Sequence, residues 1–146
     1  SLRKYRQKEV LFEFSSEVQA VVDHFGPTDF LKLGGNHSMP TSAESRFLGG
    51  QITGLKEQVL RANPITYVDK DDPPILIIHG REDIGVNFNQ SELLYAALKK
   101  AGTVTKLVPV ANAGHGYRPT PEGAEINPSK DEIDAMELAW FREHLR

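Results

Sequence analysis

Two residues suited to proton transfer each follow a segment expected to be a buried strand. Asp83 comes soon after the apolar run 74–79, and His115 comes shortly after residues 105–110. Open parallel sheets place their active sites at the carboxyl ends of the strands. An imidazole can accept a proton from a nucleophile near neutral pH, and a carboxylate can fix its tautomer and stabilise its charged form. Asp83 and His115 therefore stand in the order of the acid and base of a Ser…Asp…His triad.

The serine that such a pair would serve is missing from the sequence. A nucleophile elbow requires the pattern Gly-x-Ser-x-Gly, because the serine sits on a strained turn between a strand and a helix. Gly50 and Gly54 are the only glycines four positions apart, and Ile52 stands between them. We therefore expect the nucleophile and the oxyanion donors to lie outside this chain. The sequence predicts the C-terminal part of an enzyme, inactive by itself.

Alternating strand and helix signals must position these residues. The patterns predict three strands, a short helical turn after Ser42, and three longer helices, the last opened by a capping box of Ser129 and Glu132 and lined by Ile133 and Met136, then Trp140 and Leu145. The expected strands are residues 18–25, 74–79 and 105–110, and the expected helices are residues 55–62, 90–101 and a segment from Ser129 onward. Strands joined by helical connections form a parallel sheet with right-handed crossovers. The fold class is therefore α/β, a three-layer sandwich of about three parallel strands with flanking helices.

The same residues also allow simpler interpretations. An isolated Asp83 could be a turn or cap residue, and an isolated His115 could be a loop histidine, although its two flanking glycines suggest a backbone bent to present the ring. His79 is better explained as a hydrogen-bonded turn residue. A zinc site of His79, Asp83 and His115 is disfavoured, so no metal and no cofactor is expected. His37 is a surface residue by default, with contact to a substrate as the weaker alternative.

Composition excludes several kinds of partner. The 146 residues carry a net charge of -3, with 39% hydrophobic and 25% charged residues. Nucleic acids and anionic membrane surfaces require clustered Lys and Arg, and the one basic cluster, within residues 3–8, is assigned no function. The longest aliphatic run, residues 75–78, is far too short to span a bilayer. There are no cysteines, so disulfides and thiolate chemistry are excluded, while cytoplasmic and exported locations both stay open.

The order of several motifs resembles a known family. Gly-Pro-Thr-Asp-Phe (26–30), Ser-Ala-Glu-Ser-Arg-Phe-Leu-Gly-Gly (42–50) and Ala-Asn-Pro-Ile-Thr-Tyr-Val (62–68) precede Ile-Ile-His-Gly-Arg-Glu-Asp (77–83) and Gly-His-Gly-Tyr (114–117). This order resembles the C-terminal half of α/β-hydrolases, closest to prolyl-oligopeptidase-like and feruloyl or acetyl-xylan esterase-like lipases and esterases. The resemblance implies that Asp83 is the triad acid and His115 the triad base. One departure is Asn87, where the resembling enzymes commonly carry a proline that stiffens the loop.

The prediction is a partial α/β-hydrolase domain over residues 1–146, from a serine carboxylic-ester hydrolase. Its substrate would be a small-molecule or carbohydrate-linked ester. The alternative is a non-catalytic binding or self-association module of the same fold, since an uncovered sheet edge can pair with another chain. A homodimer through residues 1–25, or a missing N-terminal half, is the expected protein partner. If the site is intact, the Asp83 carboxylate and an His115 ring nitrogen should lie about 2.6–3.2 Å apart.

Overall fold

A parallel sheet of three strands forms the centre of the molecule. The computed structural model describes residues 17–145. The strands are β1 (Val21–His24), β2 (Ile75–Gly80) and β3 (Thr105–Val110), in the order β1-β2-β3. Val21 pairs with Ile75, and Ile75 pairs with Thr105, in parallel register. The predicted parallel α/β sheet is confirmed, and β2 is its central strand.

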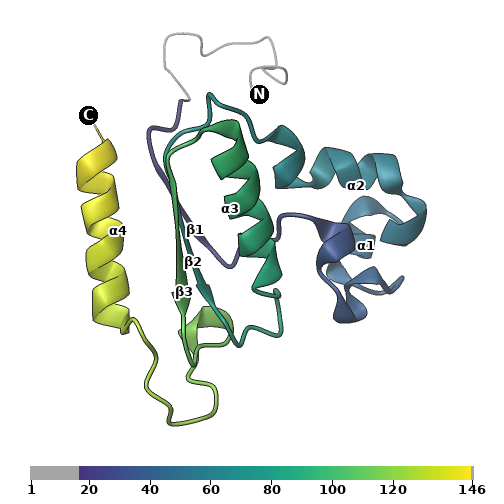
Figure 1. Ribbon diagram of the computed structural model, residues 1–146. Coiled ribbons are helices and arrows are strands. Elements are labelled where there is room, and N and C mark those ends of the chain that lie inside the picture. The colour runs from purple at the N-terminus through teal and green to yellow at the C-terminus, as the bar shows by residue number, and fades with distance from the viewer. Residues whose placement is uncertain (1–16, 146) are drawn as a thin grey trace, which may run out of the picture.

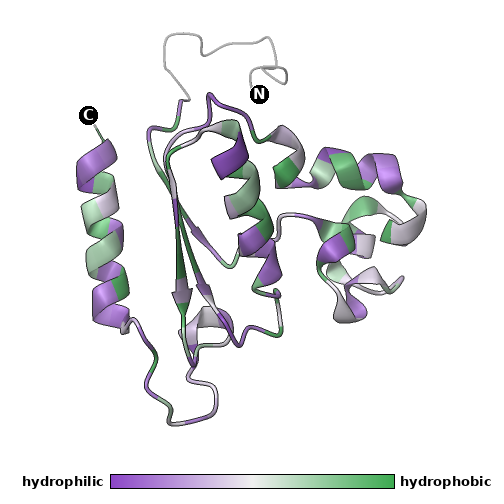
Figure 2. Ribbon diagram, viewed as in Figure 1, coloured by the Kyte–Doolittle hydropathy of each residue, from purple (hydrophilic) through white to green (hydrophobic). Residues whose placement is uncertain are grey.

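Helices cover both faces of this sheet. Figure 1 shows α3 (Asn89–Ala101) on one face and α4 (Lys130–His144) on the other. Along β2, Leu76 and Ile78 pack in the cluster that includes Ile133 and Trp140 of α4, whereas Ile77 packs with Leu94 and Leu98 of α3. A strand buried between two helical layers needs apolar side chains on both of its faces, which explains the continuous apolar run. Figure 2 shows hydrophobic residues along the sheet and a mixture of hydrophobic and hydrophilic residues along both helices.

The connection from β1 to β2 contains a small helical excursion. It carries α1 (Ala43–Leu48), α2 (Lys56–Ala62) and the 3-10 turns Phe30–Lys32, Gly35–Ser38, Ile52–Gly54 and Pro64–Tyr67. Figure 1 shows α1 and α2 beside α3, on the side away from α4. Leu33, Ile52 and Val59 are fully buried, so the excursion has an apolar centre. The predicted helical turn after Ser42 is confirmed, because the Ser42 side chain accepts from the Ser45 N–H and caps α1.

The structure differs most from the sequence prediction at the first strand and at the last helix, while the ends of the other predicted strands and longer helices agree within one residue. The first strand spans only four residues: Val18 is 62% exposed, and Phe25 leaves the strand with a φ of 57°. The apolar face of the last helix contains Ile133 and Trp140 as expected, but Leu145 follows the helix and is 53% exposed. Both errors occur at element ends, where composition is a weak guide to the backbone. Of the proposed association segment 1–25, residues 1–16 lie outside the described residues.

Candidate active site

The loops that follow β2 and β3 are bonded to each other. The Arg81 N–H donates to the Val110 carbonyl and the Glu82 N–H donates to the Ala113 carbonyl, each at 2.9 Å. Gly80 makes this approach possible, because a Cβ there would lie 2.2 Å from the Ala113 oxygen. Figure 1 shows the short turn that contains His115 (His115–Tyr117) beside the ends of the strands. Backbone contacts thus bring the two loops together independently of the candidate side chains.

Asp83 and His115 meet where these loops converge. His115 Nδ1 lies 2.8 Å from Asp83 Oδ2, so the expected distance is confirmed. The other carboxylate oxygen accepts from the backbone N–H groups of Gly85 (2.8 Å) and Val86 (2.9 Å). Burial by itself would raise the pKa of Asp83, but hydrogen bonds from Val86, His115 and Gly85 outweigh it and hold the pKa below its ordinary value. An ionised Asp83 requires the Nδ1–H form of the ring, which leaves Nε2 able to accept a proton.

The two partners differ in exposure. The Asp83 side chain is fully buried, whereas the His115 side chain is 59% exposed. A buried anion with several hydrogen-bond donors can orient an imidazole without reacting itself. An exposed ring can meet a group that is delivered from outside the chain. This division of roles is what a general base and its orienting acid need.

His79 is a second partner of the same carboxylate. Its ring is fully buried; Nδ1 lies 2.6 Å from the Ser91 hydroxyl, and Nε2 lies 2.9 Å from the Val86 carbonyl. Nε2 is also 3.2 Å from Asp83 Oδ2. Because the Val86 carbonyl oxygen and Asp83 Oδ2 can only accept hydrogen bonds, His79 Nε2 must carry a proton. His79 is hydrogen-bonded as predicted, but it lies within β2 rather than in a turn. Its contact with Asp83 is a feature that the sequence did not suggest.

The loop after β1 also reaches the site through Phe25. The Phe25 ring lies 5.0 Å from the His115 ring and 5.6 Å from the His79 ring, between ring centroids. Its φ of 57° is in the left-handed region, which costs a residue other than glycine about 1–2 kcal/mol. Sequence analysis missed this residue, because an aromatic side chain at a strand end is usually part of the core. Its only advance signal was the Gly-Pro pair that follows it.

Tyr117 links the histidine loop to β1 and α4. The Tyr117 hydroxyl lies 2.5 Å from His24 Nδ1, and His24 Nε2 lies 3.3 Å from Glu137 Oε1. Burial, together with the carboxylates of Glu137, Asp23 and Asp134, raises the pKa of Tyr117 above its ordinary value. The phenol therefore remains protonated and can donate to His24 or to a carbonyl. This network secures the end of the loop that presents His115.

His37 and Asn87 are each held by a hydrogen bond to another part of the chain. His37 Nδ1 lies 2.9 Å from Glu44 Oε1, so His37 is hydrogen-bonded within the excursion rather than joining Asp83 and His115. Asn87, which stands at the expected proline, donates from its amide to the Leu33 carbonyl. A side-chain hydrogen bond thus ties down the loop that lacks the proline. Both contacts are long-range or inter-element features that residue spacing does not encode.

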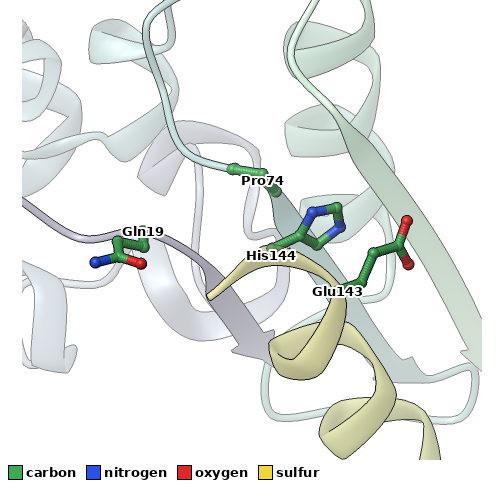
Figure 3. Close-up of a pocket in the computed structure, with 4 residues that line it drawn as sticks. All are labelled: Gln19, Pro74, Glu143 and His144. Carbon is green, nitrogen blue, oxygen red and sulfur yellow. The ribbon is translucent and has the colours of Figure 1, made fainter. Parts of the chain in front are cut away.

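A hollow elsewhere on the molecule is not this site. Figure 3 shows Gln19, Pro74, Glu143 and His144 around it, with Gln19 and Pro74 preceding β1 and β2. It therefore lies at the amino ends of the strands, opposite the edge that carries Asp83 and His115. Within residues 17–145 there is no group of three or more His, Cys, Asp or Glu side chains arranged to hold a metal ion. Over the same residues, no helix has the length and apolar character needed to cross a membrane.

The fold described above is that of an α/β-hydrolase: a parallel sheet between helical layers, with polar loops after β2 and β3. The chain belongs to the BD-FAE family, an α/β-hydrolase esterase family whose model matches residues 3–98. Asp83 lies within the matched residues and His115 lies beyond them. The match therefore supports the fold and family, and the roles of the two residues depend on their geometry.

Comparison with individual proteins agrees with this family. The uncharacterized peptidase YuxL of Bacillus subtilis (strain 168) is 34% identical over 89 residues, which are 61% of this chain and 13% of YuxL. The bifunctional GH43-CE protein of Bacteroides eggerthii is 30% identical with a TM-score of 0.75, covering 92% of this chain and 18% of that chain. A truncated carbohydrate esterase from gut microbiota is 33% identical with a TM-score of 0.56, covering 72% of this chain and 38% of that one. The chain thus spans a minor part of each of these proteins.

Proposed function

We propose that this chain is the part of a carboxylic-ester hydrolase that supplies the triad acid, Asp83, and the triad base, His115. The observation that carries the proposal is the 2.8 Å hydrogen bond between a fully buried carboxylate and a 59% exposed imidazole. Membership of an esterase family makes ester hydrolysis the favoured reaction. The nucleophilic serine and the oxyanion donors come from residues outside this chain.

The geometry is suited to general base and then general acid catalysis. His115 Nε2 accepts the serine proton as the serine oxygen attacks the ester carbonyl carbon, and Asp83 stabilises the resulting imidazolium. The same proton then passes to the departing alkoxide, which leaves an acyl-serine intermediate and a free alcohol. A water molecule then gives a proton to His115 as its oxygen attacks the acyl carbon. The bond between the acyl carbon and the serine oxygen breaks, the proton passes from His115 to the serine oxygen, and the carboxylic acid is released. Asp83 remains ionised throughout.

The substrate class we propose is a small-molecule or carbohydrate-linked ester. One structural relative is a carbohydrate esterase, which supports the second of these. YuxL is described as a peptidase, so amide hydrolysis is the competing reaction. The triad chemistry is common to both, because each bond is cleaved through an acyl intermediate. Comparing p-nitrophenyl esters with peptide p-nitroanilides separates them.

The first test uses the chain by itself. Because the nucleophile lies elsewhere, the chain should hydrolyse short p-nitrophenyl esters no faster than its Asp83→Ala, His115→Ala double variant. The measurement is the initial rate of p-nitrophenol release at matched protein concentration. A clear excess for the unchanged chain would locate a nucleophile within it and contradict this part of the proposal.

The second test uses the complete natural polypeptide that carries this chain. Asp83→Asn and His115→Gln should each reduce kcat for ester hydrolysis by about 10³- to 10⁴-fold, since losing either partner removes the correctly protonated base. Glu82→Gln and His37→Gln serve as neighbouring and paired-histidine controls, and both should retain activity. Equal losses in the controls and the test variants would remove the case for a triad.

The alternative function, a non-catalytic module, also has one supporting observation. β1 pairs only with β2, so among the described residues no strand lies along its other edge. An uncovered edge offers backbone groups to another chain. In this case the Asp83 and His115 variants of the complete polypeptide would leave hydrolysis unchanged.

A further inference from the structure

We propose that Phe25 is a positioning residue for His115, which holds the imidazole turned toward Asp83. This inference rests on the proposed role of His115 as the base. The Phe25 and His115 rings have centroids 5.0 Å apart at an interplanar angle of 49°. Phe25 also contacts His79, with centroids 5.6 Å apart at 89°. One aromatic ring therefore touches both histidines that approach Asp83 Oδ2.

His115 needs such a contact because little else restrains it. Its side chain is 59% exposed, and one hydrogen bond, from Nδ1 to Asp83, fixes the direction of the ring. Gly85 has no side chain to restrain the ring: a Cβ there would lie 3.6 Å from His115 Cγ. A ring held at a single atom can still rotate away from its acceptor, whereas an adjacent aromatic face limits this motion and favours the paired orientation.

The backbone around Phe25 is built to hold the ring in this place. On one side, the Asp23 side chain lies against Gly26, where a Cβ would be 2.2 Å from Asp23 Oδ1. On the other side, Gln90 accepts from the Thr28 N–H at 2.9 Å and from the Asp29 N–H at 2.7 Å. These contacts hold the turn that follows the left-handed Phe25, whose φ is 57°. An unfavourable conformation maintained by its surroundings is typical of positions with a functional constraint.

Tyr117 completes the contact surface. Its ring centroid lies 4.7 Å from that of Phe25, and its hydroxyl is bonded to His24, the residue before Phe25. The loop that carries His115 and the end of β1 are therefore joined both by ring contacts of Phe25 and by the bond between Tyr117 and His24. Phe25 occupies the junction of three elements, so its removal should loosen the imidazole more than the fold.

The test measures the tautomer of His115 by long-range ¹H–¹⁵N NMR on the full chain, at a pH where the ring is neutral. The unchanged chain should show mainly the Nδ1–H form that the bond to Asp83 requires. Phe25→Ala should reduce the ratio of the Nδ1–H to the Nε2–H tautomer of His115 by about 2- to 10-fold, the range expected for one aromatic contact. Phe25→Tyr retains the aromatic face and should restore the ratio. Phe47→Ala, at a 75% exposed phenylalanine of α1, is the matched control and should change nothing.

Further variants make each outcome decisive. If Phe25→Ala does not fold, Phe25→Leu retains apolar volume without the flat face and should still lower the ratio at least about 2-fold. A ratio equal to that of the unchanged chain in Phe25→Leu, or in a folded Phe25→Ala, overturns the inference. Asp83→Asn should abolish the Nδ1–H form. If it does not, the proposed function fails; if it does while Phe25 variants have no effect, only the positioning role fails.

Discussion

The carboxylates of Asp83 and Asp23, near the ends of neighbouring strands, show how hydrogen-bond donors determine the pKa of a buried aspartate. The Asp83 carboxylate accepts backbone N–H bonds from Gly85 and Val86 and lies against two imidazoles, and its pKa is lowered. The Gly26 N–H acts to lower the pKa of Asp23, whereas Asp23 Oδ2 has no hydrogen-bond partner among the described residues. Burial therefore dominates and raises the pKa of Asp23, although the charges of His79 and His24 oppose it. The pKa values of the two aspartates thus shift in opposite directions because the aspartates have different hydrogen-bond donors.

Asp23→Asn should stabilise the chain at neutral pH. A raised folded-state pKa means that the folded state holds the proton more tightly, so the stability contributed by Asp23 is present at low pH and is lost as pH rises through the folded pKa. Asparagine keeps an oxygen for the Gly26 N–H and removes the buried charge. We expect a gain of about 1 kcal/mol in the free energy of unfolding at pH 7, which fades as pH falls through the folded-state pKa of Asp23 and is absent below about pH 4. Urea unfolding of both proteins across this pH range, with exposed Asp134→Asn as control, measures it. A loss at pH 7 would mean that the nearby histidines outweigh burial.

At the scale of elements, the first turn of α3 joins three parts of the molecule. Gln90 holds the loop after β1, and the Ser91 hydroxyl bonds to His79 at the end of β2. The Asn89 amide donates to the Lys32 carbonyl in the excursion. Neither Gln90 nor Ser91 is exposed to solvent. Gln90 and Ser91 are therefore buried at the start of α3 because they supply hydrogen-bond partners to the loop after β1 and to His79.

Gln90→Met should destabilise the fold substantially. The substitution leaves the Thr28 and Asp29 N–H groups without their acceptor, and each unsatisfied buried group costs about 1–3 kcal/mol. We expect a loss of about 2–4 kcal/mol in the free energy of unfolding, measured by chemical denaturation. Gln58→Met, on the exposed side of α2, is the matched control and should stay within about 0.5 kcal/mol. Similar values for the two variants would show that the loop finds other acceptors.

For the whole molecule, the two edges of the sheet are unlike. β3 carries Lys106 and Pro109, and an edge lysine or proline discourages pairing with a further strand. β1 carries Val21 and Val22 and has no such protection among the described residues. The chain also spans only 13%, 24% and 19% of the lengths of three curated relatives. The edge at β1 is therefore where further protein is expected to bind.

We predict that the isolated chain either dimerises through this edge or is only marginally stable. Association stabilises by mass action, so a dimer should show a melting temperature that rises with protein concentration. Sedimentation velocity and thermal scans at several concentrations measure both properties. A compact monomer with a high melting temperature that does not change with concentration would contradict the prediction.

Much of the fold and the central pair of the site could be predicted from the sequence. The continuous apolar run of β2, the helical spacing of Leu94 and Leu98, and the capping box at Ser129 are local patterns, and local patterns determine element type. Asp83 and His115 could be paired in advance because parallel strands bring their carboxyl ends to one edge of a sheet. Their catalytic roles remain proposals.

Tertiary structure alone decided the surroundings of that pair. Phe25 contacts His115, which is 90 residues further along the chain, and Gln90 bonds to a loop 62 residues away, so no spacing along the chain signals either contact. The contact of His79 with Asp83 depends on the bend of the loop between them, and the left-handed φ of Phe25 depends on bonds to its neighbours. Periodicity and strand order specify which elements form and which ends meet. Orientation at that meeting point depends on packing and buried hydrogen bonds between distant residues, which exist only once the chain has folded.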